Sequence, residues 1–451
     1  MTDDPYGTFE LQSDLDLTGI LQTPIPEFQG ILYGHGHTIT YSLVMQDAEN
    51  VGLFGINNGT IRDLHLAVDL TVLGKDSRVG GLCGTNTGTV SNVRVEGTIS
   101  ADRCSYVGGL VGYWVKEGTY TLSNLFNHAD VSGMDYVGGI AGCLLNESQT
   151  YNTETVTLES LENTGVITGT DYVAGLFGML NVRNRHDATR VHANDLHNSG
   201  DVEGKTYVGG LVGDGYSDSS QSYIKNAANS SNIQALAYTG CIGGKLVNIG
   251  LENCTNKGST LQATGHISVS GELYAYVGGL AGQGYWAKNC TNTVDIDYKG
   301  EGAYVGGLFG YCPQGGSYTM SGLTNHGNIA GAQYVGGIAG SLKNESQSYA
   351  IETLTLESLE NTGMITGTDY VAGLFGGLRV NNRHDVTEVQ ASDLNNRGDI
   401  RGRTYVAGLI GHGYSDSGRS QIKYFSSTGR VYGDPPTHEL FAHLENIQLV
   451  P

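Results

Sequence analysis

Two sets of charged, polar and aromatic residues in this chain have the side-chain types that hold polar ligands. Arginine and carboxylate groups make planar hydrogen bonds, tyrosine rings stack, and grouped oxygen donors coordinate hard cations. The alternative interpretation is that these side chains bond to one another and tie loops down. We predict them as candidate ligand-binding residues of two equivalent sites. They are Glu147, Arg185, His186, Asp187, Tyr216 and Asp218 in the first set, and Glu345, Arg383, His384, Asp385, Tyr414 and Asp416 in the second.

The same residues include the groups that catalysis would need. Glycoside hydrolysis uses a pair of carboxyl groups, and Glu147 or Asp187 with Asp218 would supply such a pair. A β-helix enzyme acting on polysaccharides, a lyase or a hydrolase, is therefore the alternative to a binding protein. The presence of two copies favours binding, because duplicated sites add avidity to a binder and little to an enzyme. We expect no catalytic residues.

The sequence contains no established metal-binding pattern. Its seven cysteines include no Cys-x-x-Cys pair, which argues against a zinc site or a disulfide scaffold and for buried thiols. His438 and His443 lie five residues apart, so on a helix they would point about 140° away from each other, off a shared zinc-binding face. The loops 14–16 and 214–218 could bind calcium, although neither has the spacing of a defined calcium loop. We predict no metal site and no cofactor, with calcium as the open option.

The composition excludes several classes of protein. The chain has 451 residues, with 69 glycines, 7 prolines, 24 basic and 45 acidic residues, and a formal net charge of −21. A nucleic-acid partner is not expected, because phosphate binding needs a basic surface. The glycines follow no Gly-X-Y period, which excludes collagen. Hydrophobic residues make up 39 %, enough to offset the entropy lost on folding, so disorder is not expected.

A repeat accounts for the position of many of the glycines. The string Tyr-Val-Gly-Gly-Leu-x-Gly, with small variations, recurs at intervals of 28 to 38 residues. The intervals 30, 36 and 35 occur twice in this order, offset by 198 residues, and 36 of 43 positions are identical between 136–178 and 334–376. A block of six repeats has therefore been duplicated. The motif tyrosines are Tyr106, Tyr136, Tyr172, Tyr207, Tyr276, Tyr304, Tyr334, Tyr370 and Tyr405.

The repeat predicts short strands that stack coil upon coil. Val, Ile, Leu and Tyr occur in short runs broken by Gly and Asn, which is typical of strands separated by turns. Val107 and Leu110 both face the core only if Gly108 and Gly109 form a bend, where glycine tolerates a positive φ and lets a neighbouring backbone approach. Asparagines at a fixed place in the repeat, such as Asn163, are expected to stack as a ladder at another corner.

Variation in repeat length places the candidate residues. Five or six additional residues follow the motif in two successive repeats of each copy. In a solenoid, insertions at one corner stack along one edge and form a rim of loops, which is where such proteins usually bind ligands. We therefore expect the candidate ligand-binding residues to lie on two duplicated loop rims.

The expected fold is all-β, a parallel β-solenoid (β-helix) of about twelve coils with terminal caps. Residues 1–45 are predicted as an N-terminal entry and capping segment. Residues 46–430 form the repeat solenoid with its six-coil internal duplication, and residues 431–451 form a C-terminal cap.

The C-terminal cap is predicted to contain a short helix over 438–447. Leu440, Phe441 and Leu444 fall on one face of a helix, and Thr437 is a candidate N-cap. We expect this helix to cover the open end of the solenoid, where strand edges and apolar side chains are otherwise exposed.

The Gly-Leu-x-Gly core of the repeat, as at 109–112, resembles the GLUG-motif family, and the stretch Gly34-His35-Gly36-His37-Thr38 resembles the entry region of such proteins. The resemblance covers about residues 10–430. It implies an exported bacterial protein, as in adhesins and in the non-catalytic repeat region of immunoglobulin-A-type metallopeptidases.

We therefore predict a secreted or cell-surface module, an adhesin, ligand-binding module or structural stalk, that contacts an extracellular glycan or a host surface protein. The first residues, 1–5, do not have the form of a signal peptide, so the leader is expected to be absent from this chain. No apolar run is long enough to span a membrane, and no membrane insertion is expected. We expect a monomeric segment of a larger protein.

Overall fold

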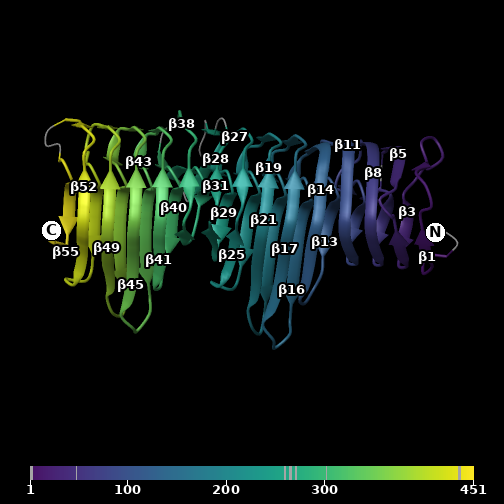
Figure 1. Cartoon of the computed structure of the whole chain (residues 1–451), viewed down its shortest axis with the longest axis horizontal. Coiled ribbons are helices and arrows are strands. Elements are labelled where there is room, and N and C mark those ends of the chain that lie inside the picture. Colours follow the sequence, from purple (N-terminus) through teal and green to yellow (C-terminus); the bar gives the residue numbers. More distant parts are fainter. Residues whose placement is uncertain are drawn as a thin grey trace. The chain divides into compact units, whose positions relative to one another are not determined.

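The chain folds into two compact units, Met1–Asn232 and Ile233–Pro451. Strands build both units, and the described residues contain no helix (Figure 1); in particular they offer no helix that is long and apolar enough to cross a membrane. The computed structural model describes residues 4–46, 48–258, 261–263, 267–269, 272–300, 302–434 and 438–450.

Each unit is a parallel β-solenoid, which confirms the predicted fold class. Its strands form three sheets, called A, B and C here, and each coil passes through C, then B, then A. In the first unit, for example, Val107 pairs with Val137 in sheet C, Tyr113 with Cys143 in sheet B, and Leu125 with Leu161 in sheet A. In this register each residue lies above the matching residue of the neighbouring coil.

The strands of the first unit have the following bounds. Sheet A contains β1 (Thr8–Glu10), β2 (Leu15–Asp16), β4 (Ile31–Tyr33), β5 (Thr38–Met45), β8 (Thr60–Val72), β11 (Thr89–Ala101), β14 (Tyr120–Gly133), β17 (Glu154–Asn163), β18 (Ile167–Thr168), β21 (Thr189–Asn198), β22 (Val202–Glu203), β25 (Ser222–Lys225) and β26 (Ala228–Asn229). Sheet B contains β3 (Ile25–Phe28), β7 (Phe54–Asn57), β10 (Cys83–Asn86), β13 (Val111–Val115), β16 (Ala141–Ser148), β20 (Phe177–Asn184) and β24 (Val212–Ser217). Sheet C contains β6 (Asn50–Val51), β9 (Arg78–Gly80), β12 (Tyr106–Gly108), β15 (Asp135–Gly138), β19 (Asp171–Ala174) and β23 (Thr206–Gly209).

The second unit repeats this arrangement. Sheet A contains β27 (Ile233–Ala235), β30 (Ile249–Glu252), β31 (Thr255–Asn256), β32 (Leu261–Ala263), β36 (Ala287–Lys288), β37 (Thr291–Asn292), β38 (Ile296–Tyr298), β41 (Tyr318–Asn325), β42 (Ile329–Ala330), β45 (Glu352–Asn361), β46 (Ile365–Thr366), β49 (Thr387–Asn396), β50 (Ile400–Arg401), β52 (Ser420–Ser427), β53 (Val431–Tyr432) and β55 (Ile447–Val450). Sheet B contains β29 (Gly243–Val247), β35 (Ala281–Gln283), β40 (Phe309–Gln314), β44 (Ala339–Ser346), β48 (Phe375–Asn382), β51 (Ile410–Ser415) and β54 (Phe441–Glu445). Sheet C contains β28 (Ala237–Gly240), β34 (Glu272–Gly278), β39 (Ala303–Gly306), β43 (Gln333–Gly336) and β47 (Asp369–Ala372), and β33 (Ile267–Val269) pairs antiparallel with β34.

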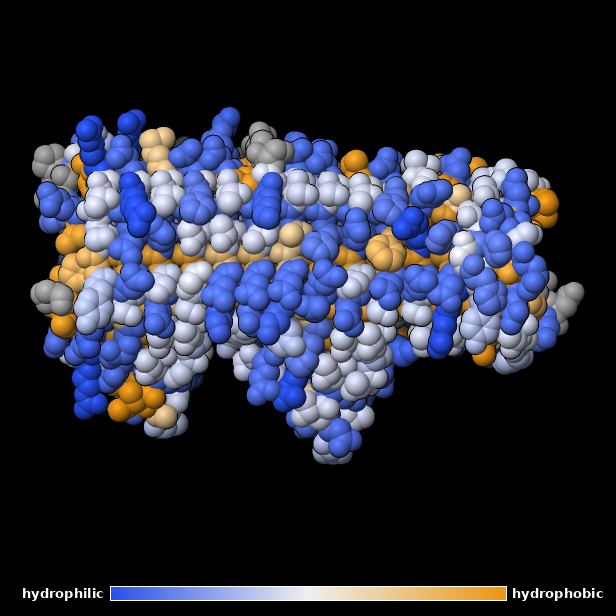
Figure 2. All heavy atoms as spheres, in the orientation of Figure 1, coloured by the Kyte–Doolittle hydropathy of each residue, from blue (hydrophilic) through white to orange (hydrophobic). Residues whose placement is uncertain are grey.

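The core of each unit consists of columns of like residues. Val107 and Leu110 are both fully buried, and the chain bends between β12 and β13, as the sequence predicted. All seven cysteines are also buried free thiols. On the face visible in Figure 2, each unit shows a narrow hydrophobic stripe between rows of mainly hydrophilic side chains.

The reason for the Gly-Gly pair differs in part from the prediction. Gly109 has no positive φ; a Cβ there would collide with the Asn127 side chain and the Gly139 carbonyl oxygen of adjacent chain segments. In several other repeats a positive φ lies instead at the motif tyrosine, with values of 49° at Tyr136 and 57° at Tyr172. Gly109 is therefore required for close packing between coils and not for a left-handed backbone conformation.

The predicted asparagine ladder is present in both units. In the first unit, Asn127 Nδ2 donates to Asn163 Oδ1 at 2.7 Å, and Asn163 Nδ2 donates to Asn198 Oδ1 at 2.7 Å. In the second unit, Asn325 and Asn361 make the corresponding bonds at 2.8 Å. Because these side chains are buried, each bond satisfies polar atoms that would otherwise be costly to remove from water.

The residues predicted as loop insertions mainly lengthen strands. Strands β16 and β17 extend beyond β13 and β14 on one side, are paired along their length with β20 and β21 on the other, and are joined by residues 149–153 alone. Such lengthened strands project from one side of each unit (Figure 1). We call these projections the first fin (residues 144–158, 180–193 and 215–224) and the second fin (residues 342–356, 378–391 and 413–422). The predicted rim therefore consists of a turn at the end of each long strand pair.

The predicted C-terminal helix over 438–447 is wrong. Phe441–Glu445 is strand β54, which pairs in parallel with β51, and His443 lies opposite His412. The free edge of β51 offers backbone partners along a whole strand, which outweighs a marginal helical pattern of ten residues. Thr437, the predicted N-cap, lies outside the described residues. The boundaries of the two predicted caps stay a prediction.

Replacing a ladder asparagine should destabilise the solenoid. Asn163→Ala removes bonds to Asn127, Asn198 and the Gly165 carbonyl. We expect the free energy of unfolding, measured by urea titration, to fall by about 2–3 kcal/mol. The matched control is Asn152→Ala, because Asn152 is exposed and the second copy has Ala350 at this position; its effect should stay within about 0.5 kcal/mol. Equal effects of the two substitutions would contradict a stabilising ladder.

Candidate ligand-binding site on the first fin

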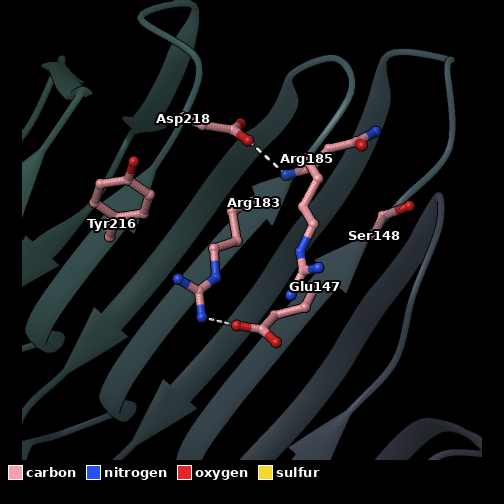
Figure 3. Close-up of a pocket in the computed structure, with 7 residues that line it drawn as sticks. Glu147, Ser148, Arg183, Arg185, Tyr216 and Asp218 are labelled. Carbon is pink, nitrogen blue, oxygen red and sulfur yellow. Dashed lines mark hydrogen bonds and ion pairs between the residues drawn. The ribbon is translucent and has the colours of Figure 1, made fainter.

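A pocket of about 310 Å³ lies on the first fin. It is built by the outer ends of three adjacent strands of sheet B, β16, β20 and β24, and by the turns that follow β20 and β24. Figure 3 shows these side chains converging from neighbouring strands. The lining residues are Glu147, Ser148, Arg183, Asn184, Arg185, Tyr216 and Asp218.

An ion pair forms one side of the pocket. Glu147 on β16 lies opposite Arg183 on β20 in the parallel register, and the two side chains point toward each other and form a salt bridge (Figure 3). Both side chains are about half exposed, at 42 % for Glu147 and 53 % for Arg183. The pair is therefore open to solvent and to a ligand, and it adds little to stability.

Asp218 holds the turn after β20 in place. Its Oδ2 accepts a hydrogen bond from the backbone N–H of Asn184 at 2.5 Å, and its Oδ1 accepts one from the backbone N–H of Thr189 at 2.6 Å. One carboxylate thus fixes the two ends of the segment that carries Arg185. Asp218 is a positioning residue in this arrangement, with both oxygens engaged.

Arg185 lies on the turn that Asp218 holds in place, and its side chain is the group that can contact a ligand. Its backbone N–H donates to the Ser148 carbonyl at 3.0 Å, which sets the direction of the chain. The side chain is exposed, and within the described part of the protein its guanidinium has no hydrogen-bond or ion-pair partner. A free guanidinium with five donors beside an open ion pair suits a ligand rich in oxygen acceptors.

Two of the predicted residues lie outside the pocket, at the end of the fin. The His186 ring stacks on Tyr151 with centroids 4.4 Å apart, and Tyr151 is 80 % exposed. Asp187 accepts hydrogen bonds from Thr153 Oγ1 at 3.2 Å and from the backbone N–H of Ala188 at 2.8 Å. These contacts order the turn, as the alternative interpretation of the sequence expected.

The second fin repeats the framework with different partners. Asp416 accepts from the backbone N–H groups of Asn382 and Thr387, and the His384 ring stacks on Tyr349 at 4.2 Å. Asp385 accepts from the backbone N–H of Val386, and Arg383 is exposed.

The ion pair of the second fin is rearranged. Asn381 occupies the position of Arg183, and Glu345 instead contacts Lys343 Nζ at 2.9 Å and Arg379 Nε at 3.9 Å. Arg379 also lies over the ring of Tyr414, with 5.8 Å from its guanidinium carbon to the centroid. The two fins therefore share a backbone frame and differ in their surface charges.

The sequence interpretation missed Arg183. Both Glu147 and Arg183 stand 11 residues after a motif tyrosine, Tyr136 and Tyr172. Superposing the repeats on their tyrosines would have placed these two side chains next to each other. Among the described residues, no group of three His, Cys, Asp or Glu side chains gathers as a metal site would.

Comparison with known proteins identifies the repeat. A family model described as the GLUG motif matches residues 76–100, so the predicted resemblance to this family is confirmed. A putative Gly-rich membrane protein of Evansella cellulosilytica is 32 % identical over 149 residues, which are 30 % of this chain and 17 % of that protein. Halomucin of Haloquadratum walsbyi is 36 % identical over 94 residues, which are 20 % of this chain and 1 % of halomucin. The chain thus spans less than a fifth of the length of either relative. No solved structure matches the chain.

Asp218→Asn should loosen the turn that carries Arg185. The amide places an N–H₂ group against a backbone N–H donor, so at least one of the two bonds is lost at a cost of about 1–3 kcal/mol. We expect the backbone amides of Asn184 and Thr189 to exchange with solvent at least tenfold faster in a hydrogen-exchange experiment. The matched control is Asp187→Asn, which should leave these two amides unchanged. Unchanged protection in Asp218→Asn would contradict the positioning role.

Proposed function

We propose that this GLUG-repeat solenoid is a non-catalytic module of a cell-surface protein that binds extracellular glycans through its two fins. The observation that carries the proposal is the exposed guanidinium of Arg185, which has no partner among the described residues and stands on the turn that Asp218 holds, beside the open Glu147–Arg183 pair in a pocket of about 310 Å³. Planar guanidinium donors and a carboxylate match the paired hydroxyl groups of a sugar ring. A pocket of this size can hold a short part of a glycan rather than a whole large ligand.

The cell-surface location is supported by the family and by the names of the relatives. The GLUG motif occurs here in a repeat protein, and one relative is named as a membrane protein. Because the chain spans only a small part of both relatives, we propose that it is likewise a segment of a larger surface protein. Two fins in one chain would add weak contacts together through multivalency.

A polysaccharide-active enzyme is the second candidate, and the pocket favours it less. Acid catalysis at a glycosidic bond needs one carboxyl group free to give a proton and a second to act as base or nucleophile. Asp218 uses both oxygens on backbone N–H groups, and Glu147 pairs with Arg183. Asp187 lies outside the pocket. Of the two pocket carboxylates, Asp218 thus holds the turn and Glu147 is paired with a cation, which agrees better with binding.

A glycan array tests the proposal. The double variant Arg185→Ala/Arg383→Ala removes one exposed guanidinium group from the turn of each fin and should lower the affinity for every glycan bound by about tenfold or more. The comparison variant His186→Ala/His384→Ala removes rings that stack on Tyr151 and Tyr349 outside the pocket, and it should retain most of the binding. Equal binding by the intact chain and the arginine variant would contradict the proposal, and turnover of any polysaccharide would favour the enzyme.

A further inference from the structure

The second unit carries another pocket, of about 270 Å³, whose lining includes part of the second fin and none of the residues of the first-fin pocket. We call it the tyrosine groove. It lies where the outer face of sheet B meets the column of motif tyrosines. Its aromatic and basic lining residues are Tyr304, Tyr311, Tyr334, Lys343, Arg379 and His412.

The tyrosine column presents ring edges to this groove. Tyr304 stacks on Tyr334 with centroids 4.8 Å apart, and Tyr334 stacks on Tyr370 at 4.4 Å with an interplanar angle of 2°. Stacking covers the electron-rich faces of the rings and leaves their edges toward the groove. The edge of an aromatic ring carries positive partial charge. Burial, more than the neighbouring Tyr370, raises the pKa of Tyr334 above its ordinary value, so its hydroxyl stays a donor at neutral pH.

Two cations lie beside these edges. Lys343 on β44 pairs in register with Arg379 on β48, so their side chains leave the sheet next to each other. Glu345 contacts both, with 2.9 Å to Lys343 Nζ and a looser 3.9 Å to Arg379 Nε. The Arg379 side chain is 61 % exposed, and among the described residues Glu345 is the one carboxylate that forms ion pairs with the two cations. The chain as a whole is strongly acidic, with a formal net charge of −21, so a positively charged groove is a local exception to the overall charge.

A glycine makes room between the cations and the tyrosines. A Cβ on Gly377 would meet the Tyr334 ring at 3.2 Å, and its φ is not in the left-handed region, so its backbone conformation does not require glycine. The first unit has Met179 at this position. The absence of a side chain at Gly377 therefore opens space against the column.

Five of the differences between the two copies lie in the lining of this groove, whereas the buried leucines of the same strands are unchanged. Within the groove, these five changes remove one acidic residue and add two basic ones, and the further change from Arg183 to Asn381 lies outside its lining. The pairs, first unit then second, are Cys143 and Ser341, Leu145 and Lys343, Met179 and Gly377, Asn181 and Arg379, and Asp214 and His412.

We propose that the tyrosine groove of the second unit is a separate binding site for a carboxylated oligosaccharide, such as a chain of uronic acids. Lys343 and Arg379 bind the carboxylate, and the tyrosine hydroxyls and Ser341 bind the sugar hydroxyls. An acidic peptide fits less well, because the sheet B strands here are paired on both sides in the unit and offer no backbone edge to an added strand. The proposal uses none of the residues of the first-fin pocket, but Lys343 and Arg379 belong to the second fin, so it rests on the proposed function and names the ligand class of that fin.

The test uses residues that the first unit already tolerates in the same frame. The double variant Lys343→Leu/Arg379→Asn installs the residue types of Leu145 and Asn181, and Gly377→Met installs that of Met179. The probes are a hexasaccharide of galacturonic acid, its methyl ester and poly-L-glutamate, each titrated into the full chain by calorimetry. Unchanged circular dichroism and melting temperature show that the variants fold.

We expect the hexagalacturonate to bind the intact chain, and to bind each variant about tenfold or more weakly. The methyl ester, which lacks the charge but keeps the sugar, should bind as weakly to the intact chain as hexagalacturonate binds to the double variant. Any of three results overturns the proposal. Hexagalacturonate does not bind, the folded variants bind it as tightly as the intact chain does, or poly-L-glutamate binds as tightly as hexagalacturonate and is weakened as much by the substitutions. The last result would assign the groove to acidic peptides instead.

Discussion

The structure of each unit depends on one constraint, the stacking of like residue over like residue in parallel register. Every strand of a coil bonds to the coils beside it, so a residue in one repeat must fit the same residue in the next. Buried asparagines meet this requirement by bonding both to their own turn and to the next asparagine, as Asn163 does with Gly165 and Asn198. Gly109 meets it by leaving space for the carbonyl of the next coil. Inward positions are therefore fixed by their neighbours above and below.

The outward positions carry no such restriction. On sheet B, side chains alternate between the core and the surface, and the strands of the two fins keep their buried leucines while exchanging Leu145 for Lys343 and Met179 for Gly377. Surface chemistry can thus change without disturbing the fold. A duplicated block is well suited to this, because one copy keeps its surface while the other acquires a different charge. The fins extend the same principle outward, since their strands remain in register as far as Glu147 and Arg183.

Much of the fold could be predicted from the sequence, because the same residue types recur at the same positions in many repeats. The parallel solenoid, the bend at Gly109 and the asparagine ladder all follow from residues that recur at one place in the frame. The helix predicted for 438–447 failed because the segment is seen once, and a free edge of β51 decided its conformation. The segments predicted as loops extend the strands instead for a similar reason, because they continue the backbone hydrogen bonding between strands of neighbouring coils. Arg183 and the tyrosine groove were not predicted, because they depend on contacts between side chains of neighbouring coils. Residues that lie side by side in different coils are far apart in the sequence.

The register of the stacked coils is the central claim, and the asparagine side chains report on it most directly. Hydrogen exchange of the primary amide protons, followed by NMR, compares Asn163 and Asn361 with the exposed Asn152. The account predicts that the two ladder amides exchange at least a hundredfold more slowly than Asn152, because each is buried and donates two hydrogen bonds. Exchange of the ladder amides at the rate of Asn152 would contradict the account, because the coils would then not be held in register.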